Sequence, residues 1–143
     1  MKILLIDDDK QDIELSLMAL SEIDLDTSVR VAYDGLEALE SLYKHDQDGK
    51  TASSAPQLII LDLKMPKLDG FKILSALKND NKLKFIPVIV FTSSGEEQDI
   101  SESYRLGVNA YVIKPIQFEK FFDTVKHIGR FWMMLNVAPA IPK

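Results

Sequence analysis

Short apolar runs alternate with longer amphipathic stretches along almost the whole chain. Five apolar runs, rich in β-branched residues or strictly alternating, predict strands at 2–6, 28–33, 58–61, 87–92 and 109–113. Parallel strands of one sheet need right-handed crossover connections, which the intervening helical patterns supply. The pattern therefore predicts a doubly wound α/β domain, with a five-stranded parallel sheet and helices on both faces.

Each stretch between the strands has apolar residues three or four positions apart, as one face of a helix requires. These faces comprise Ile13, Leu17 and Leu20; Leu36, Leu39 and Leu42; Phe71, Leu74 and Leu77; and, more weakly, Ile100 and Tyr104. A fifth helix is expected after the Lys-Pro pair at 114 and 115. The polar segment 44–57 has no clustered chemistry, and we interpret it as an inserted loop.

Composition excludes several classes of protein. The chain has 143 residues, 46% apolar and 27% charged, which is typical of one soluble domain. Its net charge of -5 argues against binding to nucleic acid or an anionic membrane by charge. The absence of cysteine excludes disulfides and thiolate metal sites. The beginning of the chain lacks the features of a signal peptide, so we expect a cytoplasmic protein.

Polar side chains with matching chemistry follow four of the five predicted strands. Asp7, Asp8 and Asp9 follow the first strand, and Asp62 follows the third. A hydroxyl group at Thr92 ends the fourth, and Lys114 follows the fifth. Ligands of open α/β sheets bind outside the carboxyl ends of the strands. We therefore expect these side chains to form one site.

Adjacent carboxylates repel one another unless a cation lies among them. Mg²⁺ prefers oxygen ligands and commonly binds one or two carboxylates, several waters and a phosphate. We therefore predict that Asp7, Asp8 and Asp62 bind Mg²⁺ as a cofactor. Asp9 and Asp34 have a simpler interpretation as N-caps, because each precedes a helical pattern.

A carboxylate at Asp62 could attack phosphorus and form an aspartyl phosphate. Phosphoryl transfer needs mainly positioning and charge neutralisation, which Lys114 and the Thr92 hydroxyl could supply. A cis peptide bond between Lys114 and Pro115 would fix the direction of the lysine. Taken singly, each residue is more simply a turn, cap or loop residue. Their convergence at one edge favours a phosphoryl-transfer site.

At these residues the sequence resembles the receiver domain of bacterial two-component response regulators. The matching pieces are ILLIDDD, LIILDLKMPKLDG, VIVFTSS and GVNAYVIKP, spread over residues 2 to about 128. The resemblance implies a flavodoxin-like fold with strand order 2-1-3-4-5, in which Asp62 accepts a phosphoryl group from a kinase histidine. It also implies that Asp8, Asp62 and the backbone carbonyl of Lys64 ligate Mg²⁺, with Asp7 assisting through water. Thr92 and Lys114 would contact the phosphoryl group.

The same resemblance implies how phosphorylation becomes a signal. When Thr92 is drawn toward the phosphoryl group, the ring of Tyr111 turns inward and changes the face made by the fourth helix, fifth strand and fifth helix. Met65 and Pro66 would shape the loop beside the acceptor, and Gly70 would open the third helix. The alternative for Tyr111 is an ordinary aromatic residue of an edge strand.

Residues 131–143 extend beyond the expected receiver domain at 1–130, too few for a separate output domain. One stripe of the extended fifth helix is predicted to face the core, with Phe118, Phe121, Val125, Ile128 and Trp132. Uncovered apolar residues often mark a partner surface. The candidate interface residues are Phe118, Phe121, Phe131, Trp132 and Leu135. The alternative is that this end folds back on the domain.

The sequence thus predicts a single-domain response regulator of a phosphorelay, with a sensor histidine kinase and a downstream or phosphotransfer protein as partners. The long loop and the extended end further resemble small regulators that partner phytochrome-type kinases and form dimers through the extended end, so a homodimer is expected. Slow hydrolysis of its own acyl phosphate would be its only catalysis, so we do not expect an enzyme.

Three alternatives remain. One is a Mg²⁺-binding scaffold. Another is a phosphohydrolase with an aspartyl nucleophile, which would normally need a further acid where Lys64 stands. A flavodoxin-like mononucleotide binder would need a glycine- or hydroxyl-rich loop after the first strand, where this chain has acids.

Overall fold

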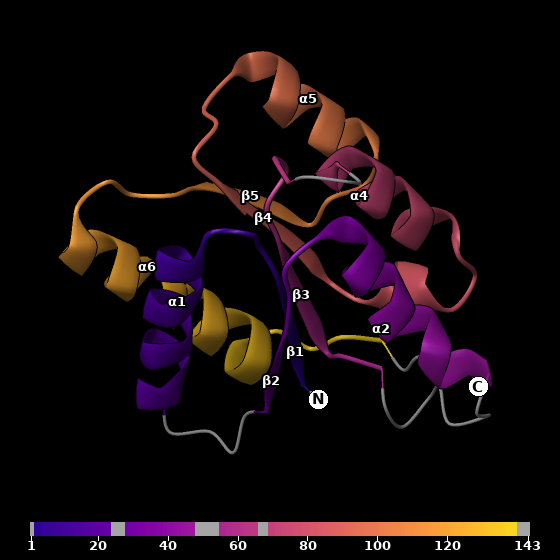
Figure 1. Cartoon of the computed structure of the whole chain (residues 1–143), viewed down its shortest axis with the longest axis horizontal. Helices are drawn as coiled ribbons and strands as arrows, with labels where there is room; N and C mark the ends of the chain where they lie inside the picture. Colours follow the sequence, from indigo (N-terminus) through magenta and orange to yellow (C-terminus); the bar gives the residue numbers. More distant parts are fainter. Residues whose placement is uncertain (1, 24–27, 48–54, 66–68, 140–143) are drawn as a thin grey trace.

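A computed structural model describes residues 2–23, 28–47, 55–65 and 69–139, and only the backbone of 44–47. Its five strands are β1 (Ile3–Ile6), β2 (Val29–Ala32), β3 (Leu58–Leu61), β4 (Val88–Thr92) and β5 (Ala110–Ile113). They form one parallel sheet in the order β2-β1-β3-β4-β5 (Figure 1). This order confirms the doubly wound fold class and all five strands that the apolar runs predicted.

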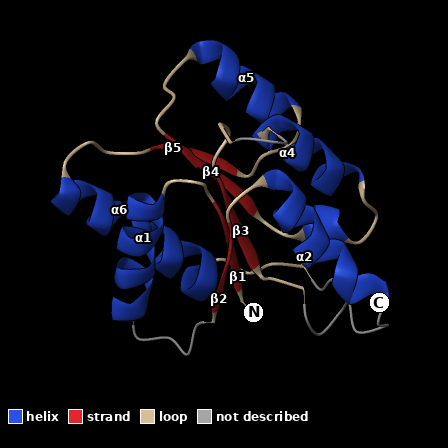
Figure 2. Cartoon of the chain, in the orientation of Figure 1, coloured by secondary structure: helices blue, strands red, loops and turns tan. Residues whose placement is uncertain are grey.

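Helices cover both faces of the sheet (Figure 2). One face carries α1 (Lys10–Glu22) and α6 (Phe118–Arg130), which pack against each other. The other carries α2 (Gly35–Gln47), α4 (Gly70–Asn79) and α5 (Glu97–Arg105). A short 3₁₀ turn, Leu83–Phe85, precedes β4. No helix within the described ranges is long and apolar enough to cross a membrane.

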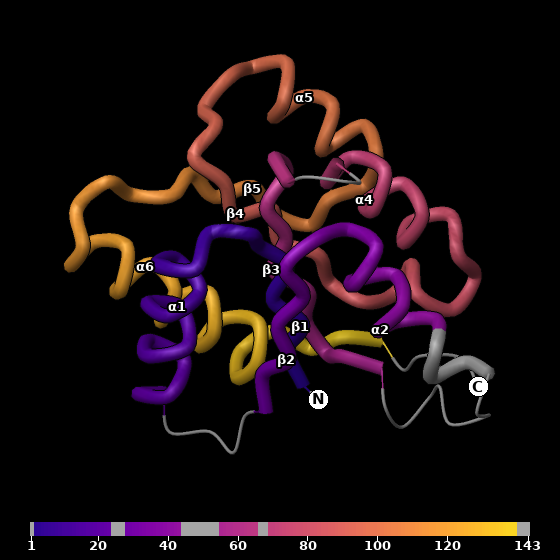
Figure 3. The backbone as a smooth tube through the Cα atoms, viewed as in Figure 1, coloured from indigo at the N-terminus to yellow at the C-terminus, as the bar shows by residue number. Residues whose placement is uncertain are grey.

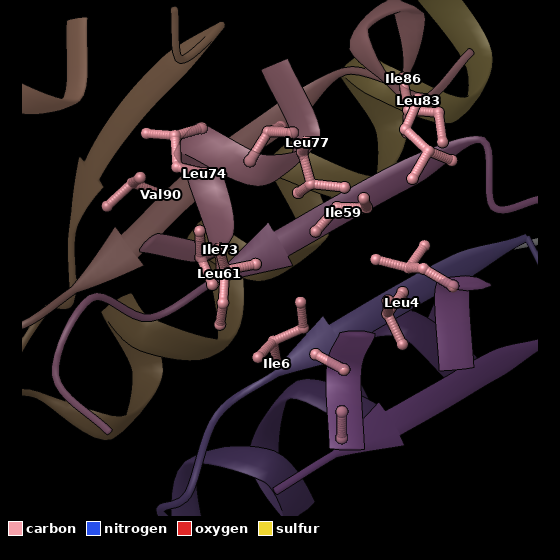
Figure 4. Close-up of a cluster of buried hydrophobic side chains, with 14 of the residues drawn as sticks. Leu4, Ile6, Ile59, Leu61, Ile73, Leu74, Leu77, Leu83, Ile86 and Val90 are labelled. Atoms are coloured by element: carbon pink, nitrogen blue, oxygen red, sulfur yellow. The ribbon is translucent and has the colours of Figure 1, made fainter. Parts of the chain in front are cut away.

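The central strands are buried on both faces, which explains why they read as unbroken apolar runs. Two core clusters lie on opposite sides of them. Figure 4 shows the cluster beneath α4, where Ile73, Leu74 and Leu77 of the helix meet side chains of β1 and β3. The apolar face predicted for the third helix is therefore correct, and it anchors the strands whose ends carry the polar residues.

Helices α1 and α2 begin at the caps that the sequence predicted. The Asp9 carboxylate accepts hydrogen bonds from the backbone N–H groups of Gln11, at 3.0 Å, and Asp12, at 3.1 Å. The Asp34 carboxylate accepts from the N–H of Glu37 at 2.8 Å. These bonds satisfy donors that a helix start leaves unpaired, and they fix where α1 leaves the end of β1.

Three predicted apolar faces each include a residue that the structure leaves exposed. The first is Leu36 of α2, which is 52% exposed, whereas Ala38 of the same helix is buried.

The other two exposed residues lie on α5 and α6. Tyr104 of α5 is 52% exposed, whereas its neighbour Ser103 is fully buried. The Ser103 hydroxyl can be buried because it donates to the carbonyl of Asp99 at 2.8 Å. Phe118 is also exposed, because it lies in the first turn of α6 and stacks on Phe122 instead of entering the core.

The extension of the fifth helix is confirmed, since α6 runs directly into a π-helical segment, Phe131–Leu135. The N–H of Asn136 closes this segment by donating to the carbonyl of Phe131 at 2.7 Å. Trp132 and Met133 pack against the core cluster of the α1 and α6 face. In Figure 3 the described end of the chain, drawn yellow, then runs toward the side of α2. The extension therefore folds back in part.

Other side chains of the same end stay uncovered. Phe131, Met134, Leu135 and Val137 are all exposed. Phe121, which the sequence offered both as a core and as an interface residue, is 3% exposed and packs against Phe91 with ring centroids 5.2 Å apart. It belongs to the core, so its assignment to an interface was wrong.

Candidate functional site

The register of the sheet brings two acids together. Ile6 of β1 pairs with Leu61 of β3, so Asp7 and Asp62 leave the sheet side by side. The N–H of Asp62 donates to the carbonyl of Ile6 at 2.9 Å, which ties the two strand ends together. With Asp8, they form a group whose carboxylate oxygens all lie within 4.8 Å of one another. Asp7 and Asp62 are buried, whereas Asp8 is exposed.

Lys114 enters this group from the end of β5. Its Nζ lies 2.8 Å from Asp7 Oδ2, 2.8 Å from Asp12 Oδ2 and 3.0 Å from Asp62 Oδ2. Its backbone N–H donates to the carbonyl of Thr92 at 2.7 Å. The peptide bond before Pro115 is trans, so the suggestion of a cis bond was wrong. The three carboxylates, rather than a cis proline, hold the ammonium in place.

Asp12 was missed as a member of the site by the sequence analysis. It lies in the first turn of α1, and its ion pair with Lys114 joins residues 102 positions apart. The sequence did offer one signal. Asp9 was predicted to cap the first helix, which places Asp12 in the first turn, the turn nearest the end of β1. The rotation of α1 about its axis decides whether that residue faces the site, and sequence did not determine it.

Burial dominates the electrostatics of the site. It disfavours the carboxylate of Asp7 and, with Asp62 nearby, raises its pKa to about 6, although Lys114 and the N–H of Asp9 oppose the rise. Burial also disfavours the ammonium of Lys114, but Asp7, Asp12 and Asp62 outweigh that effect and raise its pKa. The lysine is therefore charged, and it only partly compensates the acids around it.

The donor set fits a divalent cation. Three carboxylates within 4.8 Å of one another offer the hard oxygen ligands that Mg²⁺ and similar ions prefer. The cost of burying Asp7 as an anion, which its raised pKa reflects, would fall with a cation beside it. Lys64 is exposed, and its N–H donates to Asp62 Oδ1 at 3.4 Å. The assignment of its carbonyl as a ligand stays a prediction.

Thr92 ends β4 beside Lys114 and is fully buried. Within the part of the chain that the structure describes, its Oγ1 has no hydrogen-bond partner. Buried hydroxyl groups are nearly always bonded, so this one stands out as a donor available to a ligand. Nearby, the Tyr111 hydroxyl donates to the carbonyl of Ser94 at 2.8 Å, and the Ser94 hydroxyl donates to Asp99. The hydroxyl of Tyr111 is therefore bonded to the loop that follows Thr92.

Glycine is required where α4 meets the loop that follows Asp62. The N–H of Gly70 donates to the carbonyl of Leu63 at 2.9 Å. A Cβ at this position would lie 2.6 Å from the backbone oxygen of Asp62 and 2.6 Å from the Cα of Leu63. Met65 packs against the adjacent core, while Pro66 lies outside the described residues. Gly70 thus opens this helix, as expected, and its missing side chain lets α4 approach Asp62.

Comparison with protein families gives a match over nearly the whole chain. Residues 3–126 match the model of the response regulator receiver domain. The response regulator Rcp1 of Synechocystis sp. is 38% identical over 139 residues, covering 96% of this chain and 92% of Rcp1. A probable methanogenesis regulatory protein of Methanothrix harundinacea, FilR2, is 35% identical over 137 residues, covering 96% of this chain and 86% of its own.

Solved structures give the same result. The phosphorylated cyanobacterial phytochrome response regulator RcpA has a TM-score of 0.87 and 40% identity, with 96% of this chain and 97% of RcpA covered. The Mn²⁺-bound form of Rcp1 has a TM-score of 0.85 and 36% identity, with 98% and 100% covered. Both similarities cover nearly the whole chain.

The unbonded hydroxyl of Thr92 leads to a prediction about stability. Replacing Thr92 by the isosteric Val should raise the free energy of unfolding by about 1 kcal/mol, because the burial of an unsatisfied hydroxyl is relieved. The matched control is Ser94→Ala, which removes a hydroxyl that is bonded to Asp99 and should lower stability. Urea unfolding of the metal-free proteins measures both. A clear loss of stability in Thr92→Val would show that the hydroxyl has a partner.

Proposed function

Because this chain belongs to the response regulator receiver domain family, we propose that it is a signalling switch that accepts a phosphoryl group on Asp62. The observation that carries the assignment is the environment of that residue. Its buried carboxylate lies 3.0 Å from the ammonium of Lys114 and within 4.8 Å of two further acids. Sequence similarity to RcpA, which was solved in a phosphorylated form, supports the same chemistry.

The reaction needs a nucleophile and charge compensation. One oxygen of Asp62 attacks the phosphorus of a phosphohistidine, the bond from phosphorus to nitrogen breaks, and the electron pair stays on the imidazole, which gains a proton. Lys114 and the hydroxyl of Thr92 then hold phosphoryl oxygens. A divalent cation at Asp7, Asp8 and Asp62 would neutralise part of the developing charge, and we propose Mg²⁺ as that ion. Rcp1 in its Mn²⁺-bound form supports a divalent site.

The switch would act through Thr92 and Tyr111. A phosphoryl oxygen gives the unbonded Thr92 hydroxyl its missing partner, which draws β4 toward the site. The bond from Tyr111 to the Ser94 carbonyl lies on the loop that this movement would change. We propose that the surface of α5, β5 and α6 reports the change. Its α5 has few apolar contacts with the core and could shift at low cost.

The partner that supplies the phosphoryl group would be a sensor histidine kinase, and the similarity to phytochrome response regulators favours a phytochrome-type kinase. A hollow of about 420 Å³ on α1, lined by Lys10, Ile13, Glu14, Leu17 and Tyr33, offers a docking surface near the end of β1. A second partner downstream would bind the switched surface.

A cytoplasmic location stays a prediction, as does the absence of catalysis beyond slow loss of the phosphoryl group.

Two other functions fit less well. A phosphohydrolase with Asp62 as nucleophile would normally use a further acid two residues later, where Lys64 is exposed and basic. A scaffold that only binds a cation would have no need of an unbonded hydroxyl at Thr92. The acceptor function uses both features.

Incubation with Mg²⁺ and acetyl phosphate tests the acceptor assignment. We expect one phosphoryl adduct in the intact mass of the wild type and none in Asp62→Asn, because an amide is a far poorer nucleophile than a carboxylate. Asp123→Asn, which removes an exposed acid of α6, is the matched control and should be labelled like the wild type.

An adduct on Asp62→Asn would refute the assignment of the acceptor. If a folded wild type remained unlabelled by acetyl phosphate and by a phosphorylated histidine kinase, the switch itself would be refuted.

We also propose that the uncovered end of the molecule forms a homodimer. Phe131, Met134, Leu135 and Val137 are exposed together on one continuous segment. Phe118 lies exposed at the other end of α6. Apolar side chains gathered in this way are typical of a surface that another protein covers.

Removal of residues 131–143 should lower the mass measured by light scattering toward that of a monomer. Leu135→Glu, which changes a side chain that is 73% exposed, should act in the same direction without shortening the chain. The matched control is Met18→Glu on α1, where the native side chain is 55% exposed and outside this segment. An unchanged mass in both C-terminal variants would contradict the dimer.

A further inference from the structure

Asp12 has no part in the acceptor reaction described above, yet it makes one of the shortest contacts of the site. Its Oδ2 lies 2.8 Å from Lys114 Nζ, as close as that of Asp7 and closer than that of Asp62. The lysine side chain is only 7% exposed, and that of Asp12 is 25% exposed. An ion pair with so little access to water is screened much less than one on the surface.

The three partners of Lys114 are not equivalent. An ammonium group has three hydrogens, and here each is donated to a different carboxylate. Asp7 and Asp62 also belong to the group of acids suited to a cation, so the lysine and a cation compete for them. Asp12 lies outside that group. Among the described residues it is thus the one carboxylate bonded to Lys114 that a cation does not need.

We propose that Asp12 is a positioning residue that holds the ammonium of Lys114 when Asp7 and Asp62 turn toward a divalent cation. The inference deepens the proposed function, because it rests on a cation at the same acids. Without Asp12, the ammonium would have only Asp7 and Asp62 as partners and would compete more strongly with the cation. With Asp12, Lys114 stays charged, paired and beside the acceptor.

The local structure gives Asp12 the rigidity that this role requires. Its N–H is held by the cap at Asp9, at 3.1 Å, and α1 packs on α6. An acid in the first turn of a helix is stabilising in itself, through the helix dipole. The helix dipole does not explain the contact with Lys114, however. This lysine follows β5, at the edge of the sheet, and its ammonium lies within hydrogen-bond distance of Asp12.

Mn²⁺ binding, followed by electron paramagnetic resonance of the free ion, tests the role directly. We expect Asp12→Asn to weaken Mn²⁺ binding by on the order of tenfold, the lower end of what residues behind metal ligands contribute. Glu22→Gln removes the same charge from an exposed position at the other end of the same helix and is the matched control. It should change the affinity by less than about twofold, since exposed charges are screened.

A double-mutant cycle with Lys114→Met separates positioning from other effects. If Asp12 acts through the lysine, Asp12→Asn should change Mn²⁺ affinity in the wild type and leave it unchanged in Lys114→Met. A general effect of charge or of helix stability would persist in both backgrounds. Thermal unfolding in Mn²⁺ verifies that each variant is folded. The conservative variant Asp12→Glu keeps the carboxylate and should retain most of the affinity for Mn²⁺.

The outcomes distinguish this inference from the proposed function. Equal effects of Asp12→Asn and Glu22→Gln, or an effect that survives in Lys114→Met, would overturn the role of Asp12. A wild type that binds no Mn²⁺ would overturn it as well. A wild type that shows the expected Mn²⁺ cycle but is never phosphorylated would refute the acceptor function and leave the role of Asp12 supported.

Discussion

The structure of the site depends on one buried ammonium group shared by three carboxylates. Lys114 joins the end of the last strand to the end of the first strand, the first helix and the end of the third strand. Removing one member of such a group leaves buried charge without compensation, which is costly even where the intact group adds little net stability. A change of charge at Asp62 therefore affects Lys114 and, through it, the other two carboxylates. A phosphorylation switch needs such a coupling.

The sheet topology makes this contact possible. Strands β1 and β3 are neighbours in register, so their following residues must meet, and β4 places Thr92 beside the strand that carries Lys114. The close approach of α4 at Gly70 and the cap of α1 at Asp9 then fix the two loops that carry the acids. Each of these features is local, but the site exists only because the order of the strands brings them to one edge. The raised pKa of Asp7 reflects the cost of burying its carboxylate at that edge, beside Asp62.

The apolar runs and the turn residues after them predicted the strands and the four strand ends, because these are local signals. The order of the strands came only from the resemblance to receiver domains. Asp7, Asp62, Thr92 and Lys114 were found in that way. Asp12 was missed, and Leu36, Tyr104 and Phe118 were wrongly placed on apolar faces, for a shared reason. Packing against the sheet sets the rotation of a helix about its axis, and a stripe of apolar residues defines that rotation only to within a neighbouring position. The same limit left Phe121 assigned both to the core and to an interface, and only its packing on Phe91 of β4 decides for the core.

The central claim, that Lys114 compensates buried acids which a cation can also compensate, is tested most directly by the unfolding of Lys114→Met with and without Mg²⁺. At about pH 8, above the pKa of about 6 for Asp7, the metal-free variant should lose about 3 to 5 kcal/mol of unfolding free energy relative to the wild type. Saturating Mg²⁺ should restore most of that loss, because the cation takes over the role of the ammonium. A metal-free variant as stable as the wild type, or a loss that Mg²⁺ leaves unchanged, would contradict the account.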